Sequence, residues 1–154
     1  MKPHFNDNYR GMRCRVYMVR DGDDEEEISL LNADEVYALV KDELSIADRE
    51  IMLTVLLTTK NQLIGIETVA IGSLNSTSLV PREIFKGAIL ANAASIVLCH
   101  NHPSGGLTPS PEDIKLTEEM IQAGKLLGIK LMDHLVVSSK GFSTLRDYMT
   151  FKPI

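Results

Sequence analysis

Residues 99–113 read CHNHPSGGLTPSPED, and this stretch decides the fold prediction. A short apolar strand, Ser95–Cys99, runs directly into His100, and Pro103 ends it because proline cannot donate to a β-ladder. The loop that follows contains two glycines and two prolines. Ser110 then opens a helix that we expect to continue to about Leu127. The pattern therefore predicts a strand, a tight loop and a helix in direct succession.

The side chains of this stretch suit a metal ion. His100 and His102 are two residues apart at a strand end, so both imidazoles point to the same face. Asp113 lies in the first helical turn, where the helix dipole favours a carboxylate. Two histidines and one aspartate match the three protein ligands of a catalytic zinc site. Ser110 and Asp113 also have the spacing of a helix cap, and the cap and ligand roles are compatible.

Helical and strand periodicities continue on both sides of this stretch. Apolar spacing predicts helices that begin near Asn32, at Pro81 and at Ser110, with Asn32 and Glu35 in a capping-box pattern. Apolar or alternating runs predict strands at Ile51–Thr59, Leu63–Ile71, Ser95–Cys99, Ile129–Val137 and Gly141–Leu145, and residues 146–149 form a last turn. The predicted fold class is α/β (or α+β), with a mixed or mainly antiparallel sheet flanked by helices.

Composition excludes several classes of protein. The chain has 154 residues, 44% of them hydrophobic, with 16 basic and 21 acidic residues and a net charge of −5. An extended basic surface for nucleic acid is therefore not expected. Cys14 and Cys99 do not form a disulfide framework and are predicted to be free thiols. The N-terminus has no signal-peptide pattern and no apolar run has the length of a membrane helix, so we expect a cytoplasmic protein.

Charge changes sign sharply near the N-terminus. Residues 1–20 hold five basic side chains and one acidic, whereas residues 21–27 read DGDDEEE. We expect residues 1–29 to form a basic arm, with a strand at Cys14–Arg20 and a solvated acidic loop, and residues 30–154 to form the domain. The arm is either an exposed edge or a contact for nucleic acid or a partner protein.

Two other interpretations of the central stretch fail. A zinc deaminase requires H-x-E and P-C-x-x-C, but Pro103 and Ser104 follow His102 and the sequence has no CxxC. The contiguous His-Asn-His differs from the HNH nuclease motif, whose residues are spread over a ββα unit. Cys99 has no evident base to activate it, so a buried cysteine is the better interpretation.

The chain resembles the RadC family. One motif matches the JAMM motif of MPN/JAB-domain metalloproteins: His100-x-His102, then Ser110 after seven residues, then Asp113 after two more. Four further features resemble the RadC family in particular. They are HNHPSG, TPS-x-x-D, PREIF at residues 81–85 and the pair Asp133-His134. The resemblance covers about residues 30–150 and implies an MPN/JAB, cytidine-deaminase-like fold. The helix-hairpin-helix region of longer RadC proteins has no counterpart here, so direct DNA binding is expected to be weak or absent.

The resemblance also implies roles for individual residues. His100, His102 and Asp113 would bind Zn²⁺, and Ser110 would stabilise the oxyanion of a tetrahedral intermediate or orient the metal-bound water. JAMM enzymes use an upstream glutamate as general base, for which Glu50 is the preferred candidate and Glu83 the rival. Asp133 and His134 are candidates for supporting the ligands, with packing or solvent exposure as the alternative.

The implied function is that of a JAMM-type zinc metallohydrolase or metallopeptidase, which would cleave an amide or isopeptide bond in an unknown peptide substrate. One alternative is a DNA-repair-associated RadC-like accessory protein, and another is a non-catalytic MPN interaction module. The chain is also a possible homo-oligomer.

Overall fold

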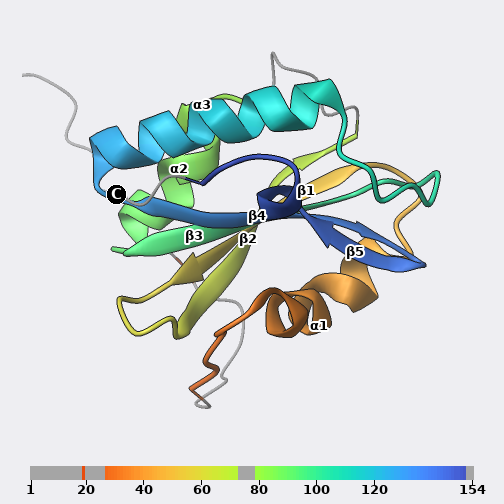
Figure 1. The fold of residues 1–154 in the computed structure, drawn as a ribbon. Helices are drawn as coiled ribbons and strands as arrows, with labels where there is room; N and C mark the ends of the chain where they lie inside the picture. Colours follow the sequence, from red (N-terminus) through yellow and green to blue (C-terminus); the bar gives the residue numbers. More distant parts are fainter. Residues whose placement is uncertain (1–18, 20–26, 73–78, 152–154) are drawn as a thin grey trace, which may run out of the picture.

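The computed structural model describes residue 19 and residues 27–72 and 79–151 (Figure 1). The helices and strands in chain order are α1 (Ala33–Leu44), β1 (Ile51–Leu57), β2 (Leu63–Ile71), α2 (Pro81–Leu90), β3 (Ser95–Asn101), α3 (Pro111–Leu127), β4 (Lys130–Ser138), β5 (Gly141–Thr144) and the 3₁₀ turn η1 (Leu145–Asp147). Of the arm predicted over residues 1–29, only Val19 and residues 27–29 are described, so the strand predicted at Cys14–Arg20 and most of the acidic loop lie outside the described residues.

The strands form a five-stranded sheet in the order β2-β1-β3-β4-β5. Three of its strand pairs are antiparallel, whereas β3 and β4 run parallel and are joined through α3. The predicted mixed sheet flanked by helices is therefore confirmed. A parallel pair requires a crossover connection, and this crossover brings the start of α3 to the end of β3.

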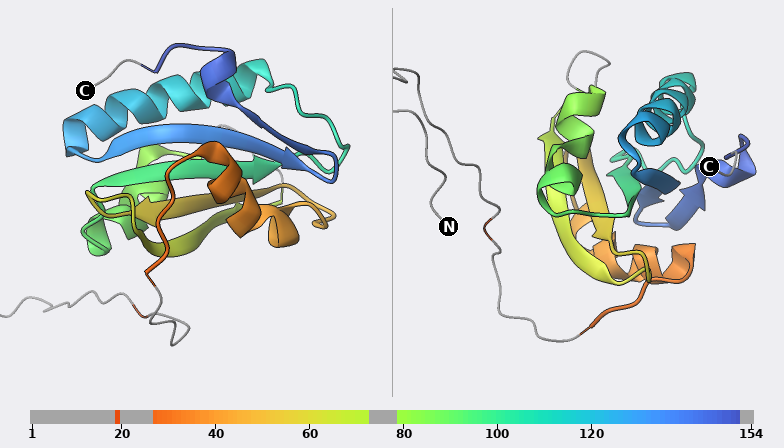
Figure 2. Two further views of the ribbon diagram at one scale, coloured as in Figure 1. Left: turned by 60° about the horizontal axis from the view of Figure 1, so that its bottom comes forward. Right: turned by 90° about the vertical axis from the view of Figure 1, so that its left-hand side faces the viewer.

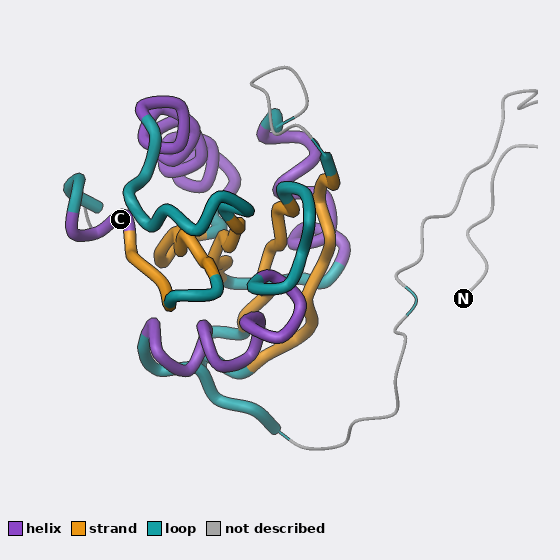
Figure 3. Tube along the Cα trace, turned by 90° about the vertical axis from the view of Figure 1, so that its right-hand side faces the viewer, coloured by secondary structure: helices purple, strands orange, loops and turns teal. Residues whose placement is uncertain are grey.

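Both faces of the sheet are covered (Figures 2 and 3). On one face, α1 packs its buried side chains Val36, Val40 and Leu44 against alternate residues of β1, β3 and β4. On the other face, α2 and α3 pack against the intervening residues, with Phe85 and Met120 fully buried. The alternation of side chains along a strand thus divides the core into two layers.

The start of α1 shows why the capping pattern predicted a helix. The Asn32 side chain accepts a hydrogen bond from the Glu35 backbone at 3.0 Å, and the Glu35 carboxylate accepts one from the Leu31 backbone at 2.6 Å. These contacts satisfy amide groups that have no partner inside the helix.

The ends of β1 and β3 each differ from the prediction by two residues, and those of β4 and β5 by one. β1 ends at Leu57 instead of Thr59, because the Thr58 hydroxyl accepts hydrogen bonds from the backbones of Lys60 and Gln62 and starts a turn. β3 continues two residues beyond Cys99 to Asn101, because His100 and Asn101 still pair with β4. The first histidine of the central stretch is therefore inside the sheet.

Within residues 27–72 and 79–151, no helix combines the length and the apolar character needed to cross a bilayer.

Candidate metal centre

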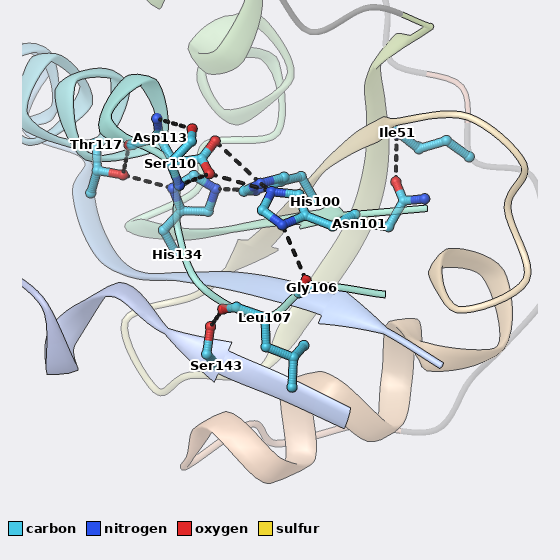
Figure 4. A network of polar contacts seen from close by, with 11 residues as sticks. Ile51, His100, Asn101, Gly106, Leu107, Ser110, Asp113, Thr117, His134 and Ser143 are labelled. Carbon is cyan, nitrogen blue, oxygen red and sulfur yellow. Dashed lines mark hydrogen bonds and ion pairs between the residues drawn. The ribbon is translucent and has the colours of Figure 1, made fainter. Parts of the chain in front are cut away.

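The three predicted ligands come from two adjacent elements. His100 lies near the end of β3 and is 1% exposed, and His102 follows the strand. Asp113 lies in the first turn of α3, whose N-terminus the crossover places beside this strand end. Figure 4 shows the side chains of His100 and Asp113 pointing toward one another. The structure thus brings together the three residues that the sequence singled out.

The distances between the ligand atoms match a tetrahedral metal site. The Nε2 atoms of His100 and His102 are 3.0 Å apart. The Asp113 carboxylate oxygens lie 3.2 Å from His100 Nε2 and 3.4 Å from His102 Nε2. Bonds of about 2.0–2.1 Å that meet at a tetrahedral angle separate their ligand atoms by about 3.3 Å. The two Asp113 distances involve different carboxylate oxygens, and one ligand atom from each residue lies within 4.8 Å of the other two, so the group can converge on a single small cation.

The hydrogen bonds of His102 leave its Nε2 atom available as a ligand. His102 Nδ1 lies 3.1 Å from the carbonyl oxygen of Gly106, which can only accept, so Nδ1 carries a proton. The Asp113 carboxylate raises the pKa of His102, and the negative charge of Glu50 adds to this effect. Burial alone would raise the pKa of Asp113, but the neighbouring imidazole groups of His100 and His102 hold it well below its usual range. Asp113 is thus an anion that faces both rings.

Ser110 forms the predicted cap. Its backbone N–H donates to the Asp113 carboxylate at 2.7 Å, and its hydroxyl oxygen accepts from the Asp113 backbone at 3.1 Å. This reciprocal pair fixes the aspartate rotamer that faces the histidines. The Ser110 hydroxyl keeps its own proton to donate elsewhere.

The residues Asp133 and His134 lie on opposite faces of β4. His134 is fully buried, and its Nε2 atom is 2.7 Å from Nδ1 of His100. Asp133 instead accepts hydrogen bonds from its neighbour's backbone and from the Thr144 hydroxyl. Of this pair, only His134 contacts a candidate ligand, because successive strand residues point in opposite directions.

Thr117 completes the surroundings of His134, and its role was not predicted from the sequence. Its hydroxyl is 2.7 Å from His134 Nδ1 and 2.7 Å from the backbone oxygen of Asp113 (Figure 4). Its position four residues after Asp113, on the same face of α3, was the available signal.

Glu50 shares a pocket with His102. It lines an open pocket of about 700 Å³ whose other lining residues are Asp48, Arg49, Gly72, His102, Pro103 and Ser104. Three hydrogen bonds to the backbone hold this segment: the Gly72 N–H donates to the Glu50 carbonyl at 2.8 Å, and the Asn101 side chain donates to the Arg49 carbonyl and accepts from the Ile51 N–H. The preferred base candidate therefore shares a pocket with one of the candidate ligands.

The rival glutamate has other partners. Glu83, on α2, accepts from Lys86 at 2.9 Å and lies 3.5 Å from Arg82. The hydrogen bond from Lys86 lowers its pKa.

Cys99 is fully buried in the layer below α1, and burial raises the pKa of its thiol. Cys99 is free, as the sequence indicated, whereas Cys14 lies outside the described residues.

Comparison with known proteins identifies the domain. The RadC-like JAB domain family matches residues 30–150. A UPF0758 protein of Moorella thermoacetica is 48% identical over 116 residues, which are 75% of this chain and 51% of that protein. A UPF0758 protein of Desulforamulus reducens is 49% identical over 113 residues, 73% of this chain and 50% of the relative. A third, from Clostridium botulinum, is 39% identical over 135 residues, which are 88% of this chain and 57% of that protein. The chain thus spans about half the length of these relatives.

Proposed function

The chain belongs to the RadC-like JAB domain family, and from that premise we propose that it is a zinc-dependent hydrolase that cleaves an amide or isopeptide bond. One observation carries this proposal: two imidazole nitrogens and a carboxylate converge at tetrahedral spacing beside an open pocket. Three protein ligands are the number found in catalytic zinc sites, in which the fourth position would be left for water or substrate, whereas structural sites use four.

A zinc ion held by these ligands supplies Lewis-acid chemistry, because it acidifies water and polarises a carbonyl group. Glu50 is assigned as the general base that takes the proton of the attacking water and returns it to the leaving amine. Its place in the pocket beside His102 supports this role. Ser110 is assigned as the donor to the substrate oxygen, since its hydroxyl proton is not used in the helix cap.

The choice of Glu50 over Glu83 rests on position. Glu50 lines the pocket that contains His102, whereas Glu83 contacts two basic side chains on its own helix. A general base must lie within hydrogen-bond reach of the proton that it abstracts, directly or through one water. The pocket position meets this requirement more readily than the surface of α2.

The function is tested with purified protein loaded with zinc. It is incubated with peptide libraries, with isopeptide-linked peptides and, as the alternative class, with DNA. We expect cleavage of an amide or isopeptide bond that chelation abolishes and zinc restores. Zinc-loaded protein that cleaves neither class of peptide, while it binds or cleaves DNA, would contradict the proposal.

A further inference from the structure

The two edge strands of the sheet differ in length and in cover. β5, at one edge, has four residues and continues directly into η1. β2, at the other edge, has nine residues, Leu63–Ile71. Among the described residues, the outer side of β2 is paired at its start alone, where the Leu63 N–H donates to the Ile28 carbonyl oxygen at 2.7 Å. The described structure therefore leaves the outer side of residues 64–71 open.

The sequence of β2 contains little that would prevent it from pairing with another strand. Edge strands commonly avoid such pairing through lysine or proline residues, or through a charge that the pairing would bury. Residues 63–71 read LIGIETVAI, with neither lysine nor proline. Their one charged residue, Glu67, points toward α2, where its carboxylate lies against Gly87. Its Oε2 atom is already buried in the single chain, so pairing at the edge adds little to the burial of this charge.

Apolar side chains line the open edge. Ile66 and Ile71 are 41% and 64% exposed. They lie opposite Val55 and Ile51 of β1 and so share the sheet face on which α1 packs. The helix covers the neighbouring strands but leaves these two side chains in contact with solvent. Exposed apolar residues on a long, unpaired edge strand are typical of a surface that associates with another strand.

A second copy of the chain fits this edge better than a foreign strand does. Two identical edge strands can pair antiparallel about a two-fold axis, and this arrangement closes at a dimer. A foreign strand is selected by side-chain pockets or charges beside the edge, whereas the exposed side chains of β2, Ile66, Thr68 and Ile71, are uncharged. Two copies therefore meet without like charges from these side chains facing one another, and they bury the exposed isoleucines of both.

We propose that β2 pairs antiparallel with β2 of a second copy and joins the two sheets into one. The register between β1 and β2 shifts on either side of residues 65–68, so this regular segment is the centre of the pairing. Stable interfaces use about 20–30 residues on each side, which is more than one strand provides, so the dimer is weak. Because the strands are antiparallel, the start of the partner's β2 lies near Gly72, which lines the pocket of Glu50 and His102. The pairing requires no metal ion.

The oligomeric state of the full-length, metal-free chain is measured by sedimentation velocity from about 1 µM to about 1 mM, the range in which a weak dimer dissociates. We expect the mass to rise with concentration from 17.1 kDa toward twice that value. Lysine on an edge strand opposes pairing, so Ile66→Lys and Thr68→Lys should each raise the dissociation constant of the dimer about tenfold or more. Leu126→Lys is the matched control, because Leu126 is 89% exposed and lies on α3, which packs against β4.

Hydrogen–deuterium exchange locates the contact on the wild-type chain, so the test does not depend on the folding of the variants. The amide groups of residues 64–71 should exchange more slowly as the protein concentration rises, whereas those of β5 should not change. Protection of β2 that is the same at every concentration would mean that another part of the same chain covers the edge. That result would overturn the inference, as would a monomer at all concentrations, assemblies larger than a dimer, a dimer without protection of β2, or a dimer unchanged in both folded lysine variants.

Discussion

The side-chain oxygen of Asn101 accepts a hydrogen bond from the backbone N–H of Ile51 at 2.6 Å. The same amide group donates to the carbonyl oxygen of Arg49 at 2.9 Å. Asn101 is 1% exposed and stands between the two histidines in the sequence. A single buried side chain therefore holds the backbone on both sides of Glu50 and links the base candidate to the strand that carries the ligands.

Asn101→Ala should impair hydrolysis and leave the zinc in place. The substitution leaves a buried N–H and a carbonyl without partners, and we expect a loss of about 1–3 kcal/mol in the free energy of unfolding. Displacement of a catalytic group by about 1 Å can reduce the rate about 10²-fold. Urea denaturation, zinc content and turnover are measured together. Full turnover in a destabilised variant would show that Glu50 is positioned by other contacts.

Glu50→Gln should abolish hydrolysis without loss of zinc. Its carboxylate is outside the ligand set, whereas loss of a general base reduces the rate by about 10²–10⁴-fold. Glu83→Gln is the matched control and should retain activity. An inactive Glu83→Gln together with an active Glu50→Gln would assign the base to α2.

The elements near the site show what sequence patterns can and cannot predict. His100, His102, Ser110 and Asp113 are close in sequence, so strand alternation and helix-cap spacing were enough to group them. Thr117 and Asn101 were missed because their partners are His134 and the Arg49–Ile51 backbone, which only the folded sheet brings near. The alternation of strand residues also separates Asp133 from His134, although the two are adjacent in the sequence and were predicted to act together.

Glu67, which lies away from the metal centre, makes the stability of the fold depend on pH. Its Oε2 atom is buried without a hydrogen-bond partner among the described residues, and it lies 1.9 Å from where a Cβ on Gly87 would be. Burial raises its pKa, against the opposing effects of the Lys86 charge and the Gly87 N–H. An acid with a raised native pKa binds more protons when folded, so the stability that it contributes is present at acidic pH and is lost as the pH rises through the native pKa.

Glu67→Gln should therefore stabilise the protein at neutral pH and have a smaller effect at acidic pH. The melting temperatures of both proteins are compared across this range, with the exposed Glu119→Gln as control. A stability difference that does not change with pH would mean that the Glu67 carboxyl group titrates alike in the folded and unfolded chains.

Gly124 allows α3 to approach the start of β4. A Cβ at this position would lie 2.4 Å from the backbone oxygen of Ile129. Overpacking of this kind costs about 1–3 kcal/mol, whereas alanine in place of a helical glycine returns at most about 1 kcal/mol. We expect Gly124→Ala to lower the free energy of unfolding in urea by about 1 kcal/mol, against a change within about 0.5 kcal/mol for the exposed Gln122→Ala. A more stable Gly124→Ala would show that the helix can move away without cost.

The zinc content of the purified chain tests the central claim most directly. Metal analysis after equilibration with zinc and removal of the excess should give about one zinc per wild-type chain, as a single site with three protein ligands requires. The double variant His100→Ala/His102→Ala should lose nearly all of it, and Asp113→Asn should lose most. Full zinc retention in the double variant, or no zinc in the folded wild type, would contradict the assignment of His100, His102 and Asp113 as a metal centre.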